Sequence, residues 1–193
     1  MTKQNFIAKI LCSLGGDSFT QESTNASLGR VYQEAQKSTV RLNLQTDKWI
    51  LFSDLHKGAK NRADDFRLNE MNYLTALDHY FEGGYNLCVM GDAEELWEEF
   101  PRTVIRHNSA SFAAEKRFHD EGRYMRLWGN HDEIWGDQKF VRNLLQPLYG
   151  HRHLDVPESI LLEVRDGNRV KRHDAAVAHL DPDRLLRTRD AAR

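Results

Sequence analysis

Three short polar strings, each directly after an apolar run, contain the residue types that could carry out chemistry. The strings are Ser53-Asp54-Leu55-His56, Gly91-Asp92 and Gly129-Asn130-His131-Asp132. Asp54 and His56 are separated by one residue, so they point to the same side if the preceding strand continues through them. Carboxylate and amide oxygens with imidazole nitrogens form a mixed donor set that suits Mn, Fe, Zn or Co, and the strings contain no cysteine. Together they predict a site for divalent metal ions.

Each string also has an ordinary explanation when it is taken alone. In a chain with nine histidines an Asp-x-His pair can arise by chance, and Gly-Asp is a common turn dipeptide. Asn-His-Asp after a glycine also suits a loop or a helix cap. What favours a common site is the order of the strings, each at the end of an expected strand and with an expected helix between successive strings.

The elements that must position these strings are strands of a parallel sheet. The runs Trp49–Phe52, Leu87–Met90 and Met125–Trp128 are short, mostly apolar and rich in β-forming residues. Helical patterns over residues 68–81 and 103–121 separate the runs, which predicts successive βαβ units. The carboxyl ends of parallel strands meet at one edge, where open α/β sheets bind ligands. We therefore expect all three strings to lie at that edge.

Residue spacing also predicts finer features of the remaining elements. The first helix should be ended by Gly83-Gly84, and its expected buried stripe is Leu68, Met71, Leu74, Leu77 and Phe81. Asp137 is placed to cap a helix over residues 139–146. Further along, a strand over residues 159–164 and a hairpin partner within 170–178 flank the turn signal Asp166-Gly167-Asn168.

Composition excludes several classes of function. Twenty-nine acidic and 27 basic residues give a net charge of −2, which argues against general nucleic-acid binding. Two cysteines are too few for a disulfide framework and favour a reduced, cytoplasmic compartment. The amino-terminal segment is a poor signal peptide, and no run approaches the roughly 18 apolar residues of a transmembrane segment. We expect a soluble protein.

In this order, the strings resemble the successive motifs D-x-H, G-D and G-N-H-[DE] of the calcineurin-like metallophosphoesterases, over residues 49–135. The resemblance implies an α/β sandwich with two divalent metal ions (Mn, Fe or Zn) at the carboxyl ends of the strands. It implies metal ligation by Asp54, His56, Asp92 and Asn130, with Asp92 bridging the two ions and His131 assisting the leaving oxygen. Asp132, beside His131, is placed to orient or stabilise that imidazole.

Two further histidine motifs of that family are not clearly present. His179, after the apolar stretch 174–178, is the candidate for the first, although Leu180 replaces the expected glycine. Gly150-His151-Arg152-His153 has the letters of the second but comes too early in the chain. We expect His179 beside Asp92 and the histidine pair at the opposite edge of the sheet. The expected fold is therefore a calcineurin-like sandwich that is incomplete at its carboxyl end.

The chain is long enough for one domain and short for two. We interpret residues 1–46 as a helical lead-in or a partner-docking arm, residues 47–180 as the metallophosphoesterase domain, and residues 181–193 as a charged tail. The expected activity of the metallophosphoesterase domain is hydrolysis of a phosphoester or pyrophosphate bond by a hydroxide that a dinuclear metal site activates.

The expected substrate is a phosphorylated small molecule or a nucleotide-like compound. The run from Gly91 to Trp97 is similar to the UDP-2,3-diacylglucosamine hydrolase branch, although helix packing explains the same residues. Four arginines are either phosphate clamps or solvated side chains: Arg62, Arg67, Arg102 and Arg106. The alternatives are a truncated, non-catalytic relative with impaired metal binding, and a purely structural α/β interaction domain.

Overall fold

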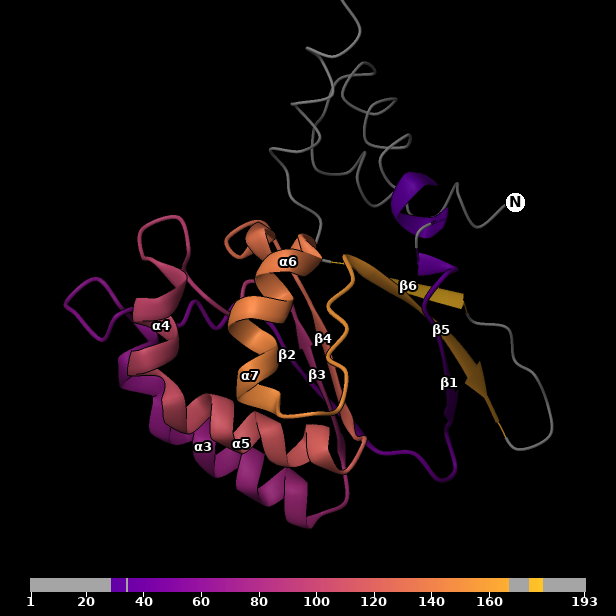
Figure 1. The fold of residues 1–193 in the computed structure, drawn as a ribbon. Coiled ribbons are helices and arrows are strands. Elements are labelled where there is room, and N and C mark those ends of the chain that lie inside the picture. The colour runs from indigo at the N-terminus through magenta and orange to yellow at the C-terminus, as the bar shows by residue number, and fades with distance from the viewer. Residues whose placement is uncertain (1–28, 34, 167–173, 179–193) are drawn as a thin grey trace, which may run out of the picture.

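The structure, a computed structural model, describes residues 29–33, 35–166 and 174–178. Two three-stranded sheets and a set of helices form a mixed α/β protein with parallel strands (Figure 1). In these ranges, none of the helices combines the length and the apolar content that crossing a membrane requires.

The first sheet contains the three strands that precede the polar strings. They are β2 (Trp49–Phe52), β3 (Asn86–Met90) and β4 (Tyr124–Leu127), in the order β2-β3-β4 and all parallel, as predicted. Leu87, Cys88 and Val89 are almost fully buried because β3 is the central strand. Val89 pairs with Phe52 on one side and Arg126 on the other, so the three carboxyl ends are nearly level.

The helix between β2 and β3 is α3 (Phe66–Glu82), and Gly83 ends it as expected. Its buried face consists of Phe66, Tyr73 and Leu77, whereas Leu68 and Met71 are 69% and 70% exposed. The predicted stripe was wrong at these two positions. Three residues turn a helix through about 300°, so repeated three-residue steps drift by roughly 60° each and leave the buried face.

The segment predicted as one long helix is two helices, α4 (Pro101–His107) and α5 (Ser109–Asp120). The break is at Asn108, whose side chain is buried and donates hydrogen bonds to the carbonyl oxygens of Gly58 (2.7 Å) and Val104 (2.9 Å). An asparagine that bonds to backbone in this way competes with helix continuation. The break thereby joins the helix pair to the loop after β2.

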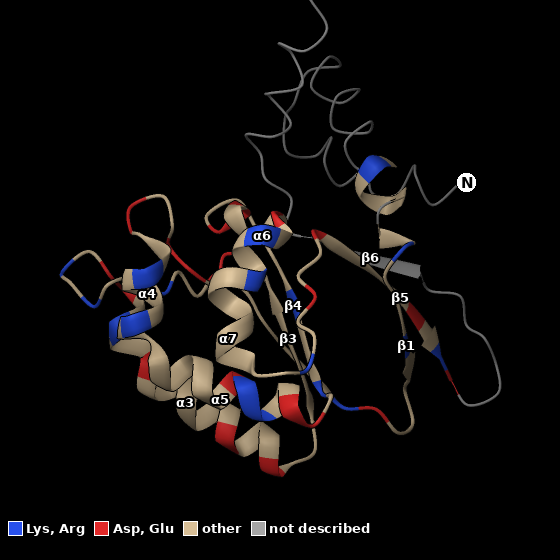
Figure 2. Cartoon of the chain, viewed as in Figure 1, with Lys and Arg blue, Asp and Glu red and all other residues tan. Residues whose placement is uncertain are grey.

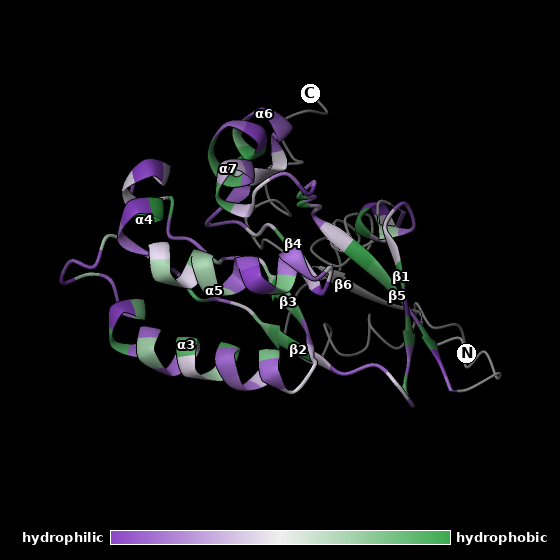
Figure 3. Ribbon diagram, turned by 60° about the horizontal axis from the view of Figure 1, so that its bottom comes forward, coloured by the Kyte–Doolittle hydropathy of each residue, from purple (hydrophilic) through white to green (hydrophobic). Residues whose placement is uncertain are grey.

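After β4, Asp137 caps the next helical segment as predicted, because its side chain accepts a hydrogen bond from the Lys139 N–H (2.8 Å). The segment consists of α6 (Gln138–Phe140), a π-helical turn (Val141–Leu145) and α7 (Gln146–Tyr149). Its buried residues pack with α5 into a second apolar cluster beside the one under α3. Figure 3 shows hydrophobic residues in the strands and more hydrophilic ones on the outer helix surfaces.

The second sheet has the order β1-β5-β6. Strand β5 (Ser159–Arg165) and its antiparallel partner β6 (Asp174–Ala178) confirm the predicted strand and hairpin. Strand β1 (Thr39–Asn43) pairs in parallel with β5 and corrects the interpretation of residues 1–46 as helical, although 29–33 and 35 are helical. Its partner lies more than a hundred residues later, so no local pattern indicated the pairing. Residues 1–28 and the tail 181–193 lie outside the described residues.

The layers follow from these packings. The first sheet lies between the helices α3 and α5 on one side and the second sheet on the other, in the views of both Figure 1 and Figure 3. The carboxyl ends of β2, β3 and β4 therefore form one edge of the layered core, and the loops that leave this edge carry the three polar strings.

Candidate metal centre

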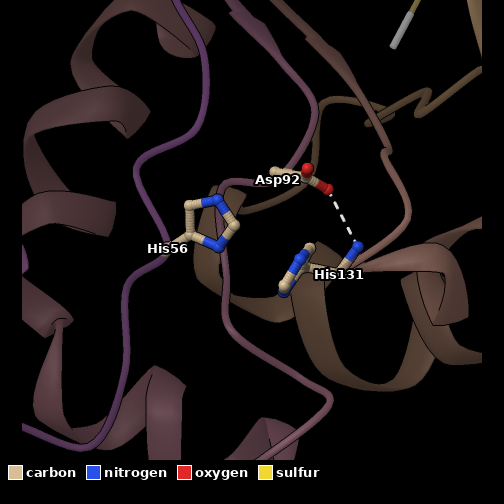
Figure 4. A group of neighbouring side chains, drawn as sticks. All are labelled: His56, Asp92 and His131. Carbon is tan, nitrogen blue, oxygen red and sulfur yellow. Dashed lines mark hydrogen bonds between the residues drawn. The ribbon is translucent and has the colours of Figure 1, made fainter. Parts of the chain in front are cut away.

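Three of the predicted site residues meet at this edge. His56, Asp92 and His131 each offer one ligand atom, and these atoms all lie within 4.8 Å of one another. Figure 4 shows the side chains arriving from three different loops and facing a common space. Two imidazole nitrogens and one carboxylate oxygen form a mixed donor set of the kind that Mn, Fe, Zn and Co accept. We refer to these residues as the His-Asp-His group.

Backbone hydrogen bonds hold the three loops in this arrangement. The His56 N–H donates to the Asp92 carbonyl (2.9 Å), and the Lys57 N–H donates to the Ala93 carbonyl (2.9 Å). The loops after β2 and β3 therefore remain side by side beyond the ends of their strands. The Asp92 carboxylate accepts a hydrogen bond from the His131 N–H (2.8 Å), drawn as a dashed line in Figure 4, and so ties in the third loop.

The backbone is left-handed at three of the predicted metal ligands. Asp54, His56 and Asp92 have φ angles of 54°, 48° and 48°. Strand β2 ends at Phe52, so the condition under which Asp54 and His56 would point to the same side, a strand that continues through both, is not met. A non-glycine residue in this region costs on the order of 1 kcal/mol or more, and such residues cluster at functional sites. The turns aim side chains that an extended chain would have aimed elsewhere.

Two glycines make room for the Asp92 side chain and its loop, as their positions in the strings predicted. Gly91 has a φ of 81°, which only glycine adopts freely. At Gly129 a Cβ atom would lie 2.4 Å from Asp92 Oδ1 and 2.7 Å from its backbone nitrogen. No side chain fits at residue 129, so the loop that carries His131 can approach Asp92 this closely only through a glycine.

Glu95 joins the two histidines of the group. Its Oε2 accepts hydrogen bonds from His131 Nδ1 (2.7 Å) and His56 Nδ1 (3.1 Å). Burial raises the pKa of the Glu95 carboxyl, but the bonds from His131 and His56 outweigh burial and hold the pKa below its ordinary value. A carboxylate that accepts the Nδ1 protons leaves each Nε2 free to bind a metal. Sequence reasoning missed this role, since Glu95 is one of four glutamates between residues 94 and 99.

Asp132 does not have the role that the sequence predicted. It is fully buried, and its two oxygens accept hydrogen bonds from the backbone N–H groups of Gly129 (2.6 Å) and Ala93 (3.0 Å). Asp132 therefore fastens the loop after β4 to the loop after β3, while Glu95 binds the imidazole of His131. Both Asp132 oxygens are occupied by backbone donors, and the His131 Nδ1 binds Glu95 instead.

Trp97 covers the other side of His131. The two rings are stacked, with centroids 3.9 Å apart and planes 22° apart, and the indole N–H donates to the Asn130 carbonyl (2.8 Å). Asn130 thus lies in the loop of the metal centre with its backbone oxygen bound by Trp97. Asp54 lines a cavity together with His56 and His131 but is not a member of the His-Asp-His group.

The later histidines remain apart from this centre or outside the structure. The His153 carbonyl oxygen lies 3.2 Å from His119 Nε2, near the end of α5, and a Cβ at Gly122 would lie 2.7 Å from Arg152 Nη2. Gly122 precedes β4, so the segment 150–153 lies at the amino-terminal edge of the sheet, remote from Asp92 as expected. His179 lies outside the described residues.

A buried ionic network lies beneath the metal centre. Its five charged residues have no exposed surface, and all three loops contribute to it; they are Lys57, Glu94, Glu115, Arg126 and Asp132. Lys57 Nζ lies 2.7 Å from Glu115 and 3.1 Å from Glu94. Arg126, on strand β4, binds Glu94 and lies 3.5 Å from Asp132. Figure 2 shows where Lys, Arg, Asp and Glu occur along the chain, β4 included. Two cations therefore partly neutralise three buried carboxylates, two of which lie in the loops after β3 and β4.

This network predicts loss of stability in acid. Burial raises the pKa of Glu115, but Lys57 and Arg126 outweigh burial and lower it to about 2 from 4.5. A carboxyl whose pKa is lowered on folding stabilises the fold above pH 4.5, and this contribution, roughly 3 kcal/mol, is lost as the pH falls towards 2. Burial and Glu94 raise the pKa of Asp132 to about 6. Protonation of Asp132 therefore stabilises the fold as the pH falls below 6, and this stabilisation is fully present below pH 3.8, where the loss from Glu115 continues.

Urea unfolding at a series of pH values measures this effect. The slope of unfolding free energy against pH in the acid range should be much smaller in Glu115→Gln than in the wild type. Glu133→Gln, at an exposed position, should keep the wild-type slope. An unchanged slope in Glu115→Gln would show that other carboxyls cause the acid loss.

The role of Glu95 leads to a second expected result. Glu95→Gln removes the charge and leaves one acceptor oxygen for two Nδ1–H donors, so Mn affinity should fall by roughly 10- to 100-fold. Calorimetric titration measures the affinity, and imidazole nitrogen chemical shifts should show loss of the single tautomer at His56 and His131. Glu133→Gln serves as the control. Wild-type affinity and unchanged shifts in Glu95→Gln would contradict the positioning role.

Comparison of the chain with known proteins identifies no related protein. No family model matches the chain, and neither a curated protein nor a solved structure matches it.

Proposed function

We propose that this chain is a metal-dependent phosphoesterase with a calcineurin-like fold. The observation that carries the proposal is the convergence of His56, Asp92 and His131 within 4.8 Å, from three loops that leave one edge of a parallel sheet. These residues belong to the three strings that resemble the family motifs. The left-handed backbone at His56 and Asp92 adds support, because strain of this kind persists where a site requires it.

The donor set fits a divalent metal ion such as Mn, Fe or Zn, which would supply Lewis acidity towards a phosphoryl oxygen. His56, Asp92 and His131 would hold the ion, and Glu95 would keep the Nδ1 protons of His56 and His131 directed away from it. Asp54 and Asn130, in the same loops, would be ligands of a second ion. Trp97, stacked on His131, would limit the rotation of that ring, whose side chain is 22% exposed towards an incoming ester.

A non-catalytic metal-binding relative is the alternative. In the part of the chain that the structure describes, the close group of potential ligands has three members, which is enough for one ion. Asp54 stands outside this group, and a chain that binds a single ion could act by binding alone.

Metal stoichiometry and turnover distinguish the two candidates. The phosphoesterase is expected to bind two equivalents of Mn in a calorimetric titration and to hydrolyse p-nitrophenyl or bis-p-nitrophenyl phosphate with Mn present. One equivalent or none, without turnover, would support the non-catalytic relative. If adding Mn leaves the thermal stability unchanged, the assignment of a metal centre is wrong, because a ligand that binds the native state must stabilise that state.

A further inference from the structure

A cavity of about 840 Å³ opens onto the His-Asp-His group. His56, His131 and Glu95 line it at the metal centre, and Asn69 and Asn72 of α3 line it further along the chain. The volume lies in the range of sites that enclose a small organic molecule, and it exceeds what a phosphate group alone needs. The cavity therefore has room for the part of an ester that extends beyond the phosphorus.

Apolar and aromatic side chains contribute to the cavity wall. Phe52, Phe66 and Tyr73 all line it, and Tyr73 makes edge-to-face contacts with both phenylalanines at centroid distances of 5.1 and 5.7 Å. These contacts fix the rings. A hydrogen bond from the Asn61 amide to Glu99 (2.8 Å) joins the loop after β2 to the loop after β3 and completes the wall.

The charged groups around the cavity are of one sign. Asp65, Glu98 and Glu99 add carboxylates to those at the metal centre, and among the described residues no lysine or arginine lines the cavity. The two nearby lysines are engaged elsewhere, because Lys57 is buried in the ionic network and Lys60 lies 2.6 Å from Glu70. The arginines considered as phosphate clamps are also absent from the lining, so apart from metal ions nothing described there would neutralise a second anionic group.

We propose that this cavity binds the organic half of the substrate and selects one that carries an ammonium group and no negative charge. Amide side chains offer hydrogen bonds, the carboxylates attract a quaternary or primary ammonium, and the same carboxylates repel an additional phosphate or carboxylate. The substrate class is then a phosphoester of an amino alcohol. The assignment of this substrate class rests on the proposed phosphoesterase function, whereas the preference of the cavity for an ammonium group can be measured by itself.

Three p-nitrophenyl phosphodiesters with arms of equal length test the preference. Their arms end in trimethylammonium, as in p-nitrophenyl phosphorylcholine, in the neutral isostere tert-butyl, or in a carboxylate. With Mn present, kcat/KM should be about tenfold higher for the trimethylammonium ester than for the tert-butyl ester, and lowest for the carboxylate ester. Equal values, or a preference for the carboxylate ester, would overturn the inference and leave the phosphoesterase intact.

Variants connect the preference to the cavity. The double variant Glu98→Gln with Glu99→Gln should reduce the ratio between the trimethylammonium and tert-butyl esters to about twofold. Glu133→Gln, outside the cavity lining, should keep the wild-type ratio. A wild-type ratio in the double variant would show that the preference arises elsewhere and would overturn the assignment to this cavity.

A binding titration without catalysis separates the two proposals. Choline chloride should shift the NMR signals of cavity residues such as Asn69 and Asn72 at lower concentrations than its tert-butyl analogue does. If none of the esters is hydrolysed, the proposed function fails, and this titration alone decides on the cavity. Equal or weaker binding of choline would overturn the inference.

Discussion

Asp92→Asn is expected to lower kcat/KM for an aryl phosphodiester by roughly a thousandfold, which corresponds to about 4 kcal/mol of lost transition-state stabilisation. Asparagine keeps the size of the side chain, and its amide oxygen can still accept the hydrogen bond from the His131 N–H. What the substitution removes is the negative charge of the His-Asp-His group. The loops should remain in place while the affinity for Mn falls.

Calorimetric titration with Mn, steady-state kinetics and circular dichroism measure these consequences in one preparation. Asp155→Asn, at an exposed position outside the group, is the matched control and should behave like the wild type. If Asp92→Asn kept wild-type turnover and Mn affinity, the convergence of the three side chains would have no metal-binding role. If the variant lost its secondary structure, His56→Asn would repeat the test from another loop.

Lys57→Met is expected to destabilise the fold by about 3 to 5 kcal/mol, because it leaves buried carboxylates without their cation. The Lys57 ammonium is fully buried between Glu94 and Glu115 and also lies 4.4 Å from the centre of the Phe112 ring. Methionine fills similar space but supplies no charge or donor. Since a domain is stable by only about 5 to 15 kcal/mol, this loss is a large fraction of the total.

Equilibrium unfolding in urea provides the measurement. Lys116→Met is the control, because Lys116 is partly exposed on α5 and pairs with Asp120 one turn later, a contact worth less than about 1 kcal/mol. The denaturant slopes of wild type and variants should agree, so that the midpoints report stability. Equal midpoints for Lys57→Met and Lys116→Met would show that the buried network does not stabilise the fold.

Several parts of the structure were predictable because they depend on neighbours along the chain. The strands before the three strings are short apolar runs, and Gly83 and Asp137 are end signals that act on their own helices. The need for glycine at residues 91 and 129 was also visible in the strings. The local pattern of burial and turn chemistry was therefore sufficient to locate the loops in which His56, Asp92 and His131 lie.

Other features depended on residues that lie far apart in the sequence. Glu95 binds His56 from 39 residues away, and Lys57 binds Glu115 from 58 residues away. A charge pattern does not reveal such pairs, because a charged residue in a polar loop is usually solvated. The pairing of β1 with β5 likewise joins segments more than a hundred residues apart.

The sequence by itself determined where chemistry could occur, since strand ends, turns and ligand types are local properties of the chain. Tertiary structure alone decided which of those residues act together. It assigned the histidine partner to Glu95 and the fastening of the loops to Asp132, because hydrogen-bond partners are chosen by distance in space. It also turned scattered charges into one buried network, because neutralising a charge away from water requires a partner within a few ångströms.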